Sequence, residues 1–231
     1  MGSEAVWRVI DVLEWTRSFF ATRGIESARL DAEVLLAHVL GVPRIMLYAR
    51  FDQPLTDAER VALRELVKRR ASREPVAYLV GKKEFWSMTL ETPPGVLIPR
   101  SDTETLVSAA LDHAPKDTAA LRIVDAGTGS GAVALALAKE LPNAQIVAYD
   151  VSQFALQVAR TNAQALGLSD RISFVCASAL SALEEAPFGL IVANLPYIPS
   201  AAIGSLMPDV RHHEPHLAST AGPMASSWSL R

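Results

Sequence analysis

The sequence predicts an α/β protein in which a small all-α domain precedes a doubly wound parallel sheet. Up to about residue 75 the apolar residues recur at helical spacing, whereas beyond residue 100 short apolar runs alternate with helical segments. Between them, apolar and polar residues alternate in the segment 76–99, as is typical of extended chain. This segment also contains Pro93-Pro94-Gly95, which is typical of a turn. The predicted organisation is therefore a helical domain at 1–75, a β-hairpin linker at 76–99 and an α/β domain at 100–231.

The composition excludes several classes of protein. Hydrophobic residues make up 50% of the 231 residues, and 22 Lys and Arg against 25 Asp and Glu give a net charge of -3. This balance excludes disorder and a broad basic surface for nucleic acid. Cys176 is the only cysteine, which excludes a disulfide framework, and no apolar run approaches the roughly 18 residues that span a bilayer. We expect a cytoplasmic protein without a membrane partner.

Three helices are expected in the first domain. The first is indicated by apolar residues at helical spacing, namely Val6, Trp7, Ile10 and Leu13. The second runs through Leu30, Val34, Leu35 and Val39 and stops at Gly41. The third opens at Thr56, where Glu59 completes a capping-box pattern, and ends in Lys68-Arg69-Arg70. We interpret that basic run as cations that offset the helix dipole, with a small nucleic-acid patch as the alternative.

Strands and helices are expected to alternate in the α/β domain. The predicted strands are 121–124, 145–149, 172–176 and 190–193, and the predicted helices are 132–141 and 152–166. In the hairpin, Phe85 and Trp86 are interpreted as core residues, and Cys176 is expected to lie buried in its strand. No catalytic residue set is present in the helical domain, so the chemistry is expected in the α/β domain.

A glycine-rich loop, Asp125-Ala126-Gly127-Thr128-Gly129-Ser130-Gly131, lies between a predicted strand and a predicted helix. Glycines there let the backbone turn tightly and let a ligand lie against N–H groups at the helix start. Asp150 follows about 20 residues later at the end of the next strand, where a carboxylate can accept ribose hydroxyls. The pair predicts a nucleotide site. Because Gly127-x-Gly129-x-x-Ala132 also fits the dinucleotide fingerprint, an NAD-dependent oxidoreductase remains an alternative.

A second motif, Asn194-Leu195-Pro196-Tyr197, follows the predicted strand 190–193 directly. It resembles the (N/D)PP(Y/F) signature of S-adenosylmethionine-dependent methyltransferases that act on planar NH2 groups. An amide nitrogen is a poor nucleophile, so it must be held in line with the sulfonium methyl group. The Asn194 side-chain oxygen and the Leu195 carbonyl can accept its two N–H protons, and Tyr197 can stack on the planar group. A nucleic-acid adenine-N6 methyltransferase is the alternative that shares this motif.

With further motifs, the chain resembles the release factor glutamine methyltransferases (the HemK/PrmC family) from about Ala28 to Ala218. Besides the loop, Asp150 and the Asn194 motif, the resemblance rests on Leu30-Asp31-Ala32-Glu33, Leu35-Leu36, Arg73-Glu74-Pro75-Val76-Ala77-Tyr78, Gly81, Glu84-Phe85-Trp86, Pro94-Gly95-Val96-Leu97-Ile98-Pro99-Arg100, Thr103-Glu104 and Glu214-Pro215-His216. The resemblance implies a Rossmann-like methyltransferase sheet. It also implies methyl transfer from S-adenosylmethionine to the side-chain amide of Gln in the Gly-Gly-Gln motif of class 1 peptide-chain release factors.

The resemblance assigns roles by position. The residues implied to bind the cofactor are Gly127, Thr128, Gly129, Ser130, Gly131, Asp150 and Asn194. Those implied to act on the glutamine are Asn194, Leu195, Pro196 and Tyr197. The helical domain would dock the release factor, without direct binding of nucleic acid. His212, His213 and His216 match no standard metal site, so no metal is expected.

Three departures from the family pattern accompany the resemblance. Leu195 replaces the second Pro of the signature, and Ala177-Ser178-Ala179 replaces a stretch with a carboxylate and an aromatic beside the adenine. In residues 219–231 the apolar residues recur with neither the period of two of a strand nor the period of 3.6 of a helix. Family members continue at this point with the last three strands of the sheet. We therefore expect the C-terminal strands to be missing. A catalytically impaired, truncated homologue of low solubility is the corresponding alternative.

Overall fold

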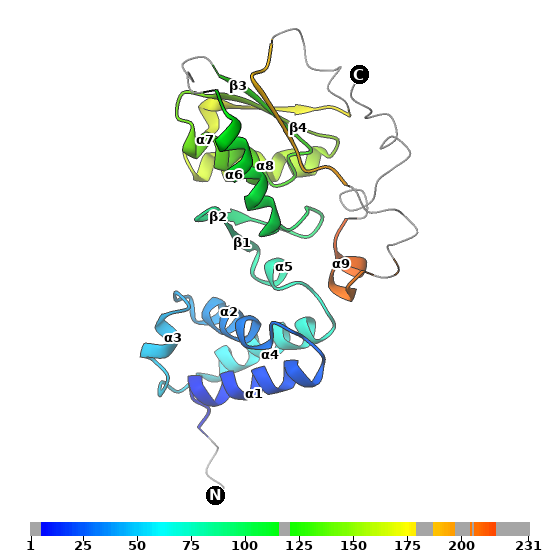
Figure 1. Cartoon of the computed structure of the whole chain (residues 1–231). Helices are drawn as coiled ribbons and strands as arrows, with labels where there is room; N and C mark the ends of the chain where they lie inside the picture. Colours follow the sequence, from blue (N-terminus) through cyan, green and yellow to red (C-terminus); the bar gives the residue numbers. More distant parts are fainter. Residues whose placement is uncertain (1–5, 116–120, 179–186, 197–203, 205, 216–231) are drawn as a thin grey trace, which may run out of the picture. The chain divides into compact units, whose positions relative to one another are not determined.

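The computed structural model describes residues 6–115, 121–178, 187–196, 204 and 206–215 (Figure 1). The chain divides into two compact units, Met1–Val80 and Gly81–Arg231. Residues 76–80, predicted to be extended, form a helix that belongs to the first unit, so the division falls after Val80 rather than after residue 75. Among the described residues, no helix is both long and apolar enough to span a bilayer.

The first unit is entirely helical. Its helices are α1 (Val9–Thr22), α2 (Ala28–Leu40), α3 (Met46–Ala49), α4 (Asp57–Ala71) and α5 (Val76–Val80). The capping box predicted at Thr56 is present, with the Thr56 hydroxyl accepting from the Glu59 N–H and the Glu59 carboxylate accepting from the Thr56 N–H. Gly41 ends α2 in the left-handed conformation, at φ 62°. The local signals in the sequence therefore locate these helix ends correctly.

One prediction for these helices is wrong, and one of their apolar residues is exposed. Val6 and Trp7 precede α1, because Arg8 forms a bridge with Pro54 and the Leu55 N–H donates to the Trp7 carbonyl oxygen, which keeps this stretch extended. Leu30 is 48% exposed, whereas the buried apolar side chains of α2 come from Ala28, Ala32, Leu35, Leu36 and Ala37. The predicted second helix is confirmed, and of the residues that indicated it Leu35 lies in the core and Val39 packs against that core.

The basic run at the end of α4 is held in ion pairs within the unit. Lys68 pairs with Glu65 at 2.7 Å and Arg69 with Glu74 at 2.5 Å. Arg70 is buried, and its Nε lies 2.7 Å from Oδ2 of Asp31 on α2, which is also buried. The run thus stabilises the helical unit internally, and it offers little free charge for nucleic acid.

The second unit opens with an antiparallel hairpin, β1 (Lys82–Phe85) and β2 (Met88–Glu91). Its turn uses Trp86 and Ser87 at φ 50° and 53°. Phe85, Met88 and Leu90 are buried in the main core, as predicted for Phe85, and Trp86 packs against that core from its edge. The hairpin is therefore part of the α/β unit and contributes to its core.

The elements that follow alternate as predicted. They are α6 (Asp102–His113), β3 (Arg122–Ala126), α7 (Ala132–Glu140), β4 (Gln145–Asp150), α8 (Gln153–Ala165), the 3-10 turn η1 (Ser169–Arg171), β5 (Ile172–Cys176), β6 (Leu190–Ala193) and α9 (Pro208–His213). The strands from β3 on form a parallel four-stranded sheet in the order β5-β4-β3-β6. The predicted parallel sheet of an α/β domain is confirmed, with β6 on the opposite side of β3 from β4.

The main core lies between one face of the sheet and the helices α6, α7 and α8 (Figure 1). Ile123, Ile146 and Ala148 face this core, and α7 is buried along its whole apolar stretch from Ala132 to Ala138. The side chains of Val124, Ala126 and Tyr149 form a separate cluster. Successive side chains of a strand point to opposite faces of the sheet, so neighbouring residues of these strands pack in different clusters.

Cys176 is exposed, and its prediction as a core residue is wrong. It is the last residue of β5, which forms one edge of the sheet in the described part of the chain, while β6 forms the other. The predicted loss of further strands concerns residues 219–231, which lie outside the described residues.

Candidate active site

Three adjacent strands end at the same level of the sheet. In the register of β4, β3 and β6, Tyr149 pairs with Ala126 and Ala126 pairs with Ala193. The residues that follow are Asp150, Gly127 and Asn194, so the predicted site residues emerge side by side. The chain runs outward from β3 to β5 and then returns to place β6 on the other side of β3. Such a switch point is where open α/β sheets bind ligands.

The glycine loop depends on its glycines for its conformation. Gly127, Gly129 and Gly131 have φ of 71°, 57° and 86°, a region that other L-residues rarely adopt. A Cβ on Gly131 would lie 3.1 Å from Leu135 and 3.2 Å from Ala159, so this glycine permits close packing against α8. A Cβ on Gly129 would meet nothing within 4 Å. The loop therefore packs tightly on its inner side and leaves open space above Gly129.

Asp150 touches the loop directly. Its Oδ2 accepts a hydrogen bond from the Gly129 N–H at 2.9 Å, and its Oδ1 accepts one from the Ser152 N–H at 2.9 Å. The acid and the loop, separated in sequence, thus form one site. The Gly129 N–H, expected to be bare, is already engaged, while the carboxylate keeps lone pairs for further donors.

Asp125 anchors the loop from below. Its side chain is buried, and Oδ2 accepts from the Thr128 hydroxyl at 2.7 Å and from the Ala134 N–H in the first turn of α7 at 3.1 Å. Burial raises the pKa of this carboxyl to about 6; the two hydrogen bonds oppose the rise and the charge of Asp150 adds to it. The sequence analysis named Asp125 with the loop but did not recognise this anchoring role.

Asn162 of α8 ties the loop to the hairpin, a role that the sequence analysis missed. Its Nδ2 donates to the carbonyl oxygens of Ser130 at 2.9 Å and Glu91 at 3.1 Å. Its Oδ1 accepts from the Glu91 N–H at 2.7 Å. A buried amide among the apolar residues of α8 was the available signal, because buried polar groups need hydrogen-bond partners.

Asn194 and Leu195 place the second motif beside the loop. Asn194 Nδ2 donates to the hydroxyl of Thr103 in α6 at 3.2 Å. A Cβ on Gly127 would lie 3.0 Å from Leu195 Cδ2, and Leu195 packs against the cluster of Val124 and Tyr149. The residue that replaces the signature Pro thus supports the loop through its apolar side chain. Pro196 is half-buried, and Tyr197 lies outside the described residues.

An ion pair between the exposed Arg100 and the buried Glu214 joins two further stretches that the resemblance singled out. Arg100, just before α6, lies 2.5 Å from Oε1 of Glu214, whose side chain is 1% exposed. Burial raises the pKa of Glu214, and the Arg100 charge opposes this rise. The pair therefore fixes the start of α6 to the segment after α9. Among the described residues, no group of His, Cys, Asp and Glu is arranged to hold a metal ion.

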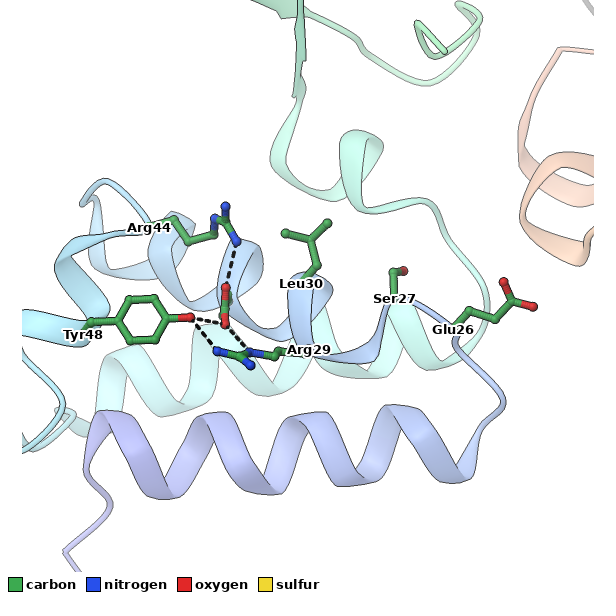
Figure 2. Close-up of a pocket in the computed structure, with 7 residues that line it drawn as sticks. Glu26, Ser27, Arg29, Leu30, Arg44 and Tyr48 are labelled. Atoms are coloured by element: carbon green, nitrogen blue, oxygen red, sulfur yellow. Dashed lines mark hydrogen bonds and ion pairs between the residues drawn. The ribbon is translucent and has the colours of Figure 1, made fainter. Parts of the chain in front are cut away.

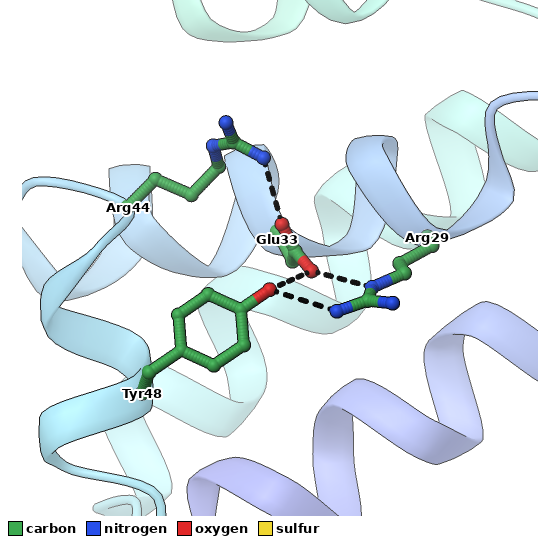
Figure 3. A network of polar contacts seen from close by, with 4 residues as sticks. All are labelled: Arg29, Glu33, Arg44 and Tyr48. Carbon is green, nitrogen blue, oxygen red and sulfur yellow. Dashed lines mark hydrogen bonds and ion pairs between the residues drawn. The ribbon is translucent and has the colours of Figure 1, made fainter.

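The helical unit carries a separate polar surface on α2 and α3. The buried carboxylate of Glu33 accepts hydrogen bonds from Arg29 at 3.0 Å, Arg44 at 2.9 Å and the Tyr48 hydroxyl at 2.6 Å (Figure 3). Burial disfavours the charged form of Glu33 and by itself would raise its pKa. The hydrogen bonds from Tyr48 and the two arginines outweigh this effect, so the pKa of Glu33 is lowered. Both guanidinium groups remain exposed.

These residues line a surface pocket, which Figure 2 shows with Leu30 and Tyr48 beside the arginines. The complete lining is Glu26, Ser27, Arg29, Leu30, Glu33, Arg44 and Tyr48. About half of the surface of Leu30 and of Tyr48 is exposed. The pocket thus presents apolar groups and fixed positive charges together.

Comparison with known proteins places both units in one family. The PrmC N-terminal domain matches residues 11–81, and the methyltransferase small domain matches residues 89–207. Release factor glutamine methyltransferases from Geobacter sulfurreducens, Rhodopirellula baltica and Chlorobaculum tepidum are 45%, 44% and 44% identical to this chain. The alignments cover 94%, 96% and 96% of this chain and 75%, 76% and 78% of those proteins. With its helical unit and methyltransferase unit both matched, the chain belongs to the release factor glutamine methyltransferase family.

Proposed function

We propose that this chain transfers a methyl group from S-adenosylmethionine to the side-chain amide nitrogen of the Gln in the Gly-Gly-Gln motif of class 1 peptide-chain release factors. One observation carries the proposal: the glycine loop, Asp150 and Asn194 follow three adjacent strands that end at one level of the sheet. The proposed nucleoside-binding residues and the proposed amide-binding motif therefore follow adjacent strands, which supports the proposal. The methyltransferase domain match speaks against the NAD-dependent alternative.

The residues of the loop fit the cofactor. The space above Gly129 lets a ligand approach the backbone, and the Asp150 carboxylate at the edge of the loop has lone pairs for ribose hydroxyls. Gly127 to Gly131 would line the cofactor, while Asp125 and Asn162 hold the loop in place. When bound, S-adenosylmethionine supplies an electrophilic methyl group on a positively charged sulfur.

Asn194 and Leu195 would hold the substrate amide. Oδ1 of Asn194 and the carbonyl oxygen of Leu195 are the acceptors for its two N–H groups, and Tyr197 remains the proposed stacking partner. This orientation places the nitrogen in line with the methyl group, and positioning of this kind lowers a barrier by several kcal/mol. The N–C bond forms as the S–C bond breaks, and the amide proton leaves to solvent afterwards. No general base has to act before the transfer.

Methyl transfer from labelled S-adenosylmethionine tests the reaction. We expect label on a release factor, and none on the same factor with its motif Gln changed to Ala. Label on DNA adenine instead would favour the adenine-N6 alternative. No label on either substrate would favour the impaired homologue and contradict the proposal.

Asn194→Ala should slow single-turnover transfer by about 100-fold or more, because an acceptor that orients the amide is lost. Ser108→Ala, a change on the exposed side of α6, is the control and should retain the parent rate. A rate of Asn194→Ala within a few-fold of the parent would exclude this role. Circular dichroism and thermal unfolding establish that both variants fold.

We further propose that the pocket on α2 and α3 docks the release factor. Leu30 and Tyr48 offer apolar area, and Glu33 holds the arginine side chains in place, which reduces the entropy lost on binding. Leu30→Ser should raise the KM for the release factor about tenfold, as expected of a central contact residue, with kcat unchanged. Val61→Ser on α4 is the matched control, since Val61 is similarly exposed. Equal effects of the two changes would place docking elsewhere.

A further inference from the structure

Thr103 contacts the amide group of Asn194 from a fixed position. It is the second residue of α6, only 9% of its surface is exposed, and its Oγ1 accepts from Asn194 Nδ2 at 3.2 Å. The bond links residues that are 91 positions apart in sequence. It therefore joins the first turn of α6 to the end of β6, where the Asn194 motif begins.

An asparagine side chain ends in two chemically opposite groups. Its oxygen accepts hydrogen bonds, its nitrogen donates them, and a half-turn of the amide exchanges their positions. Because Nδ2 donates to Thr103, the nitrogen lies on the side of α6 and Oδ1 is the end turned away from Thr103. In this arrangement Oδ1 is the end of the amide that is available to a ligand.

We propose that Thr103 is a positioning residue that holds Asn194 so that Oδ1, rather than Nδ2, meets the N–H of the substrate amide. This inference rests on the proposed function, in which Oδ1 is an acceptor. A turned amide would set one N–H donor against another and remove the acceptor that orients the substrate. Thr103 itself acts through Asn194 and does not touch the substrate.

The start of α6 is anchored well enough to serve as a reference point. Arg100 is paired with the buried Glu214, and the carboxylate of Glu104 accepts from the Trp86 N–H of the hairpin turn at 2.9 Å. The Thr103 N–H donates to the Arg100 carbonyl oxygen at 3.1 Å. Contacts on both sides of Thr103 therefore limit its movement, as a group that orients a catalytic side chain requires.

Two substitutions separate the hydroxyl from the shape of the side chain. Thr103→Val keeps the shape and removes the hydroxyl, whereas Thr103→Ser keeps the hydroxyl. With saturating cofactor and release factor, Thr103→Val should slow single-turnover methyl transfer about tenfold, the effect of one lost hydrogen bond. The KM for the release factor and the Kd for S-adenosylmethionine should stay within about twofold of the parent. Thr103→Ser should restore most of the rate, and Ser108→Ala on the same helix controls for loss of an α6 hydroxyl.

A double-mutant cycle tests whether Thr103 acts through Asn194. In an Asn194→Ala background, Thr103→Val should cause no further loss, because residues that share one interaction have non-additive effects. A full additional loss in that background, or equal slowing by Thr103→Val and Thr103→Ser, would overturn the proposal. Thermal unfolding of each variant identifies any loss that comes from misfolding.

A spectroscopic readout is independent of methyl transfer. The side-chain NH2 resonances of Asn194, identified by their absence in Asn194→Ala, should shift in Thr103→Val and remain near their parent positions in Thr103→Ser. If the parent chain does not methylate release factors but these shifts occur, the proposed function fails while the orienting contact stands. Unchanged resonances in Thr103→Val would show that Thr103 does not orient Asn194.

Discussion

The carboxyl group of Asp125 should make the second unit less stable as the pH rises, and Asp125→Asn should remove this dependence. Asp125 is 1% exposed, and burial raises its pKa from the ordinary value of 3.8 to about 6. Both hydrogen bonds to the side chain, from Thr128 and Ala134, are accepted by Oδ2. The carboxamide oxygen of Asn can accept the same two bonds, so the substitution removes the charge with little change in shape.

The sign of the effect follows from proton binding. Below pH 3.8 the carboxyl is protonated in the folded and the unfolded chain, and its contribution to stability is fully present. Between pH 3.8 and about 6 the unfolded chain loses the proton first, so the folded chain binds more protons and its stability falls as the pH rises. Above about pH 6 both states are charged and the loss is complete.

The magnitude follows from the size of the pKa change. At about 1.4 kcal/mol for each tenfold change in proton affinity, a rise from 3.8 to about 6 corresponds to about 3 kcal/mol. About 2 kcal/mol of this loss falls between pH 4.5 and 6.5. Across that range the free energy of unfolding of the parent chain should therefore fall by about 2 kcal/mol relative to that of Asp125→Asn.

Urea unfolding at several pH values measures this difference. Trp86 reports on the second unit if Trp7, Trp15 and Trp228 are changed to Phe in both proteins. Other titrating groups are shared by the two proteins, so they cancel in the comparison. A difference between parent and variant that stays constant from pH 4.5 to 6.5, or that changes in the opposite direction, would refute the reasoning.

Two further substitutions test other contacts. Asp150→Ala should weaken S-adenosylmethionine binding about tenfold, because the ribose hydroxyls lose an acceptor. Asp170→Ala, which changes an exposed acid, is the control. If calorimetry gives the same Kd for both variants, the ribose binds elsewhere. Arg70→Ala should destabilise the helical unit by about 3 kcal/mol, because Asp31 is left buried without this charge partner. The exposed Arg64→Ala should cost less than about 0.5 kcal/mol in the same urea unfolding experiment, and similar losses for both would contradict the argument.

Local sequence signals are enough to predict those features that depend on a few neighbouring residues. The capping box at Thr56, the left-handed Gly41 and the turn of Gly127 to Gly131 depend on side chains and glycines close by in the chain. The alternation of strands and helices follows from hydrophobic periodicity. The meeting of Asp150, Gly127 and Asn194 follows from a further rule, that the carboxyl ends of parallel strands lie at one edge of the sheet.

The burial of individual side chains and the contacts between distant residues depend instead on how whole elements pack together. Periodicity cannot tell that Leu30 and Cys176 are exposed, because exposure depends on which elements pack around them. The hydrogen bonds of Asn162 to Glu91 and Asn194 to Thr103, and the ion pair of Arg100 with Glu214, span 71, 91 and 114 positions. Such partners are brought together by the packing of whole elements, and local preference, which acts over a few residues, carries no information about them.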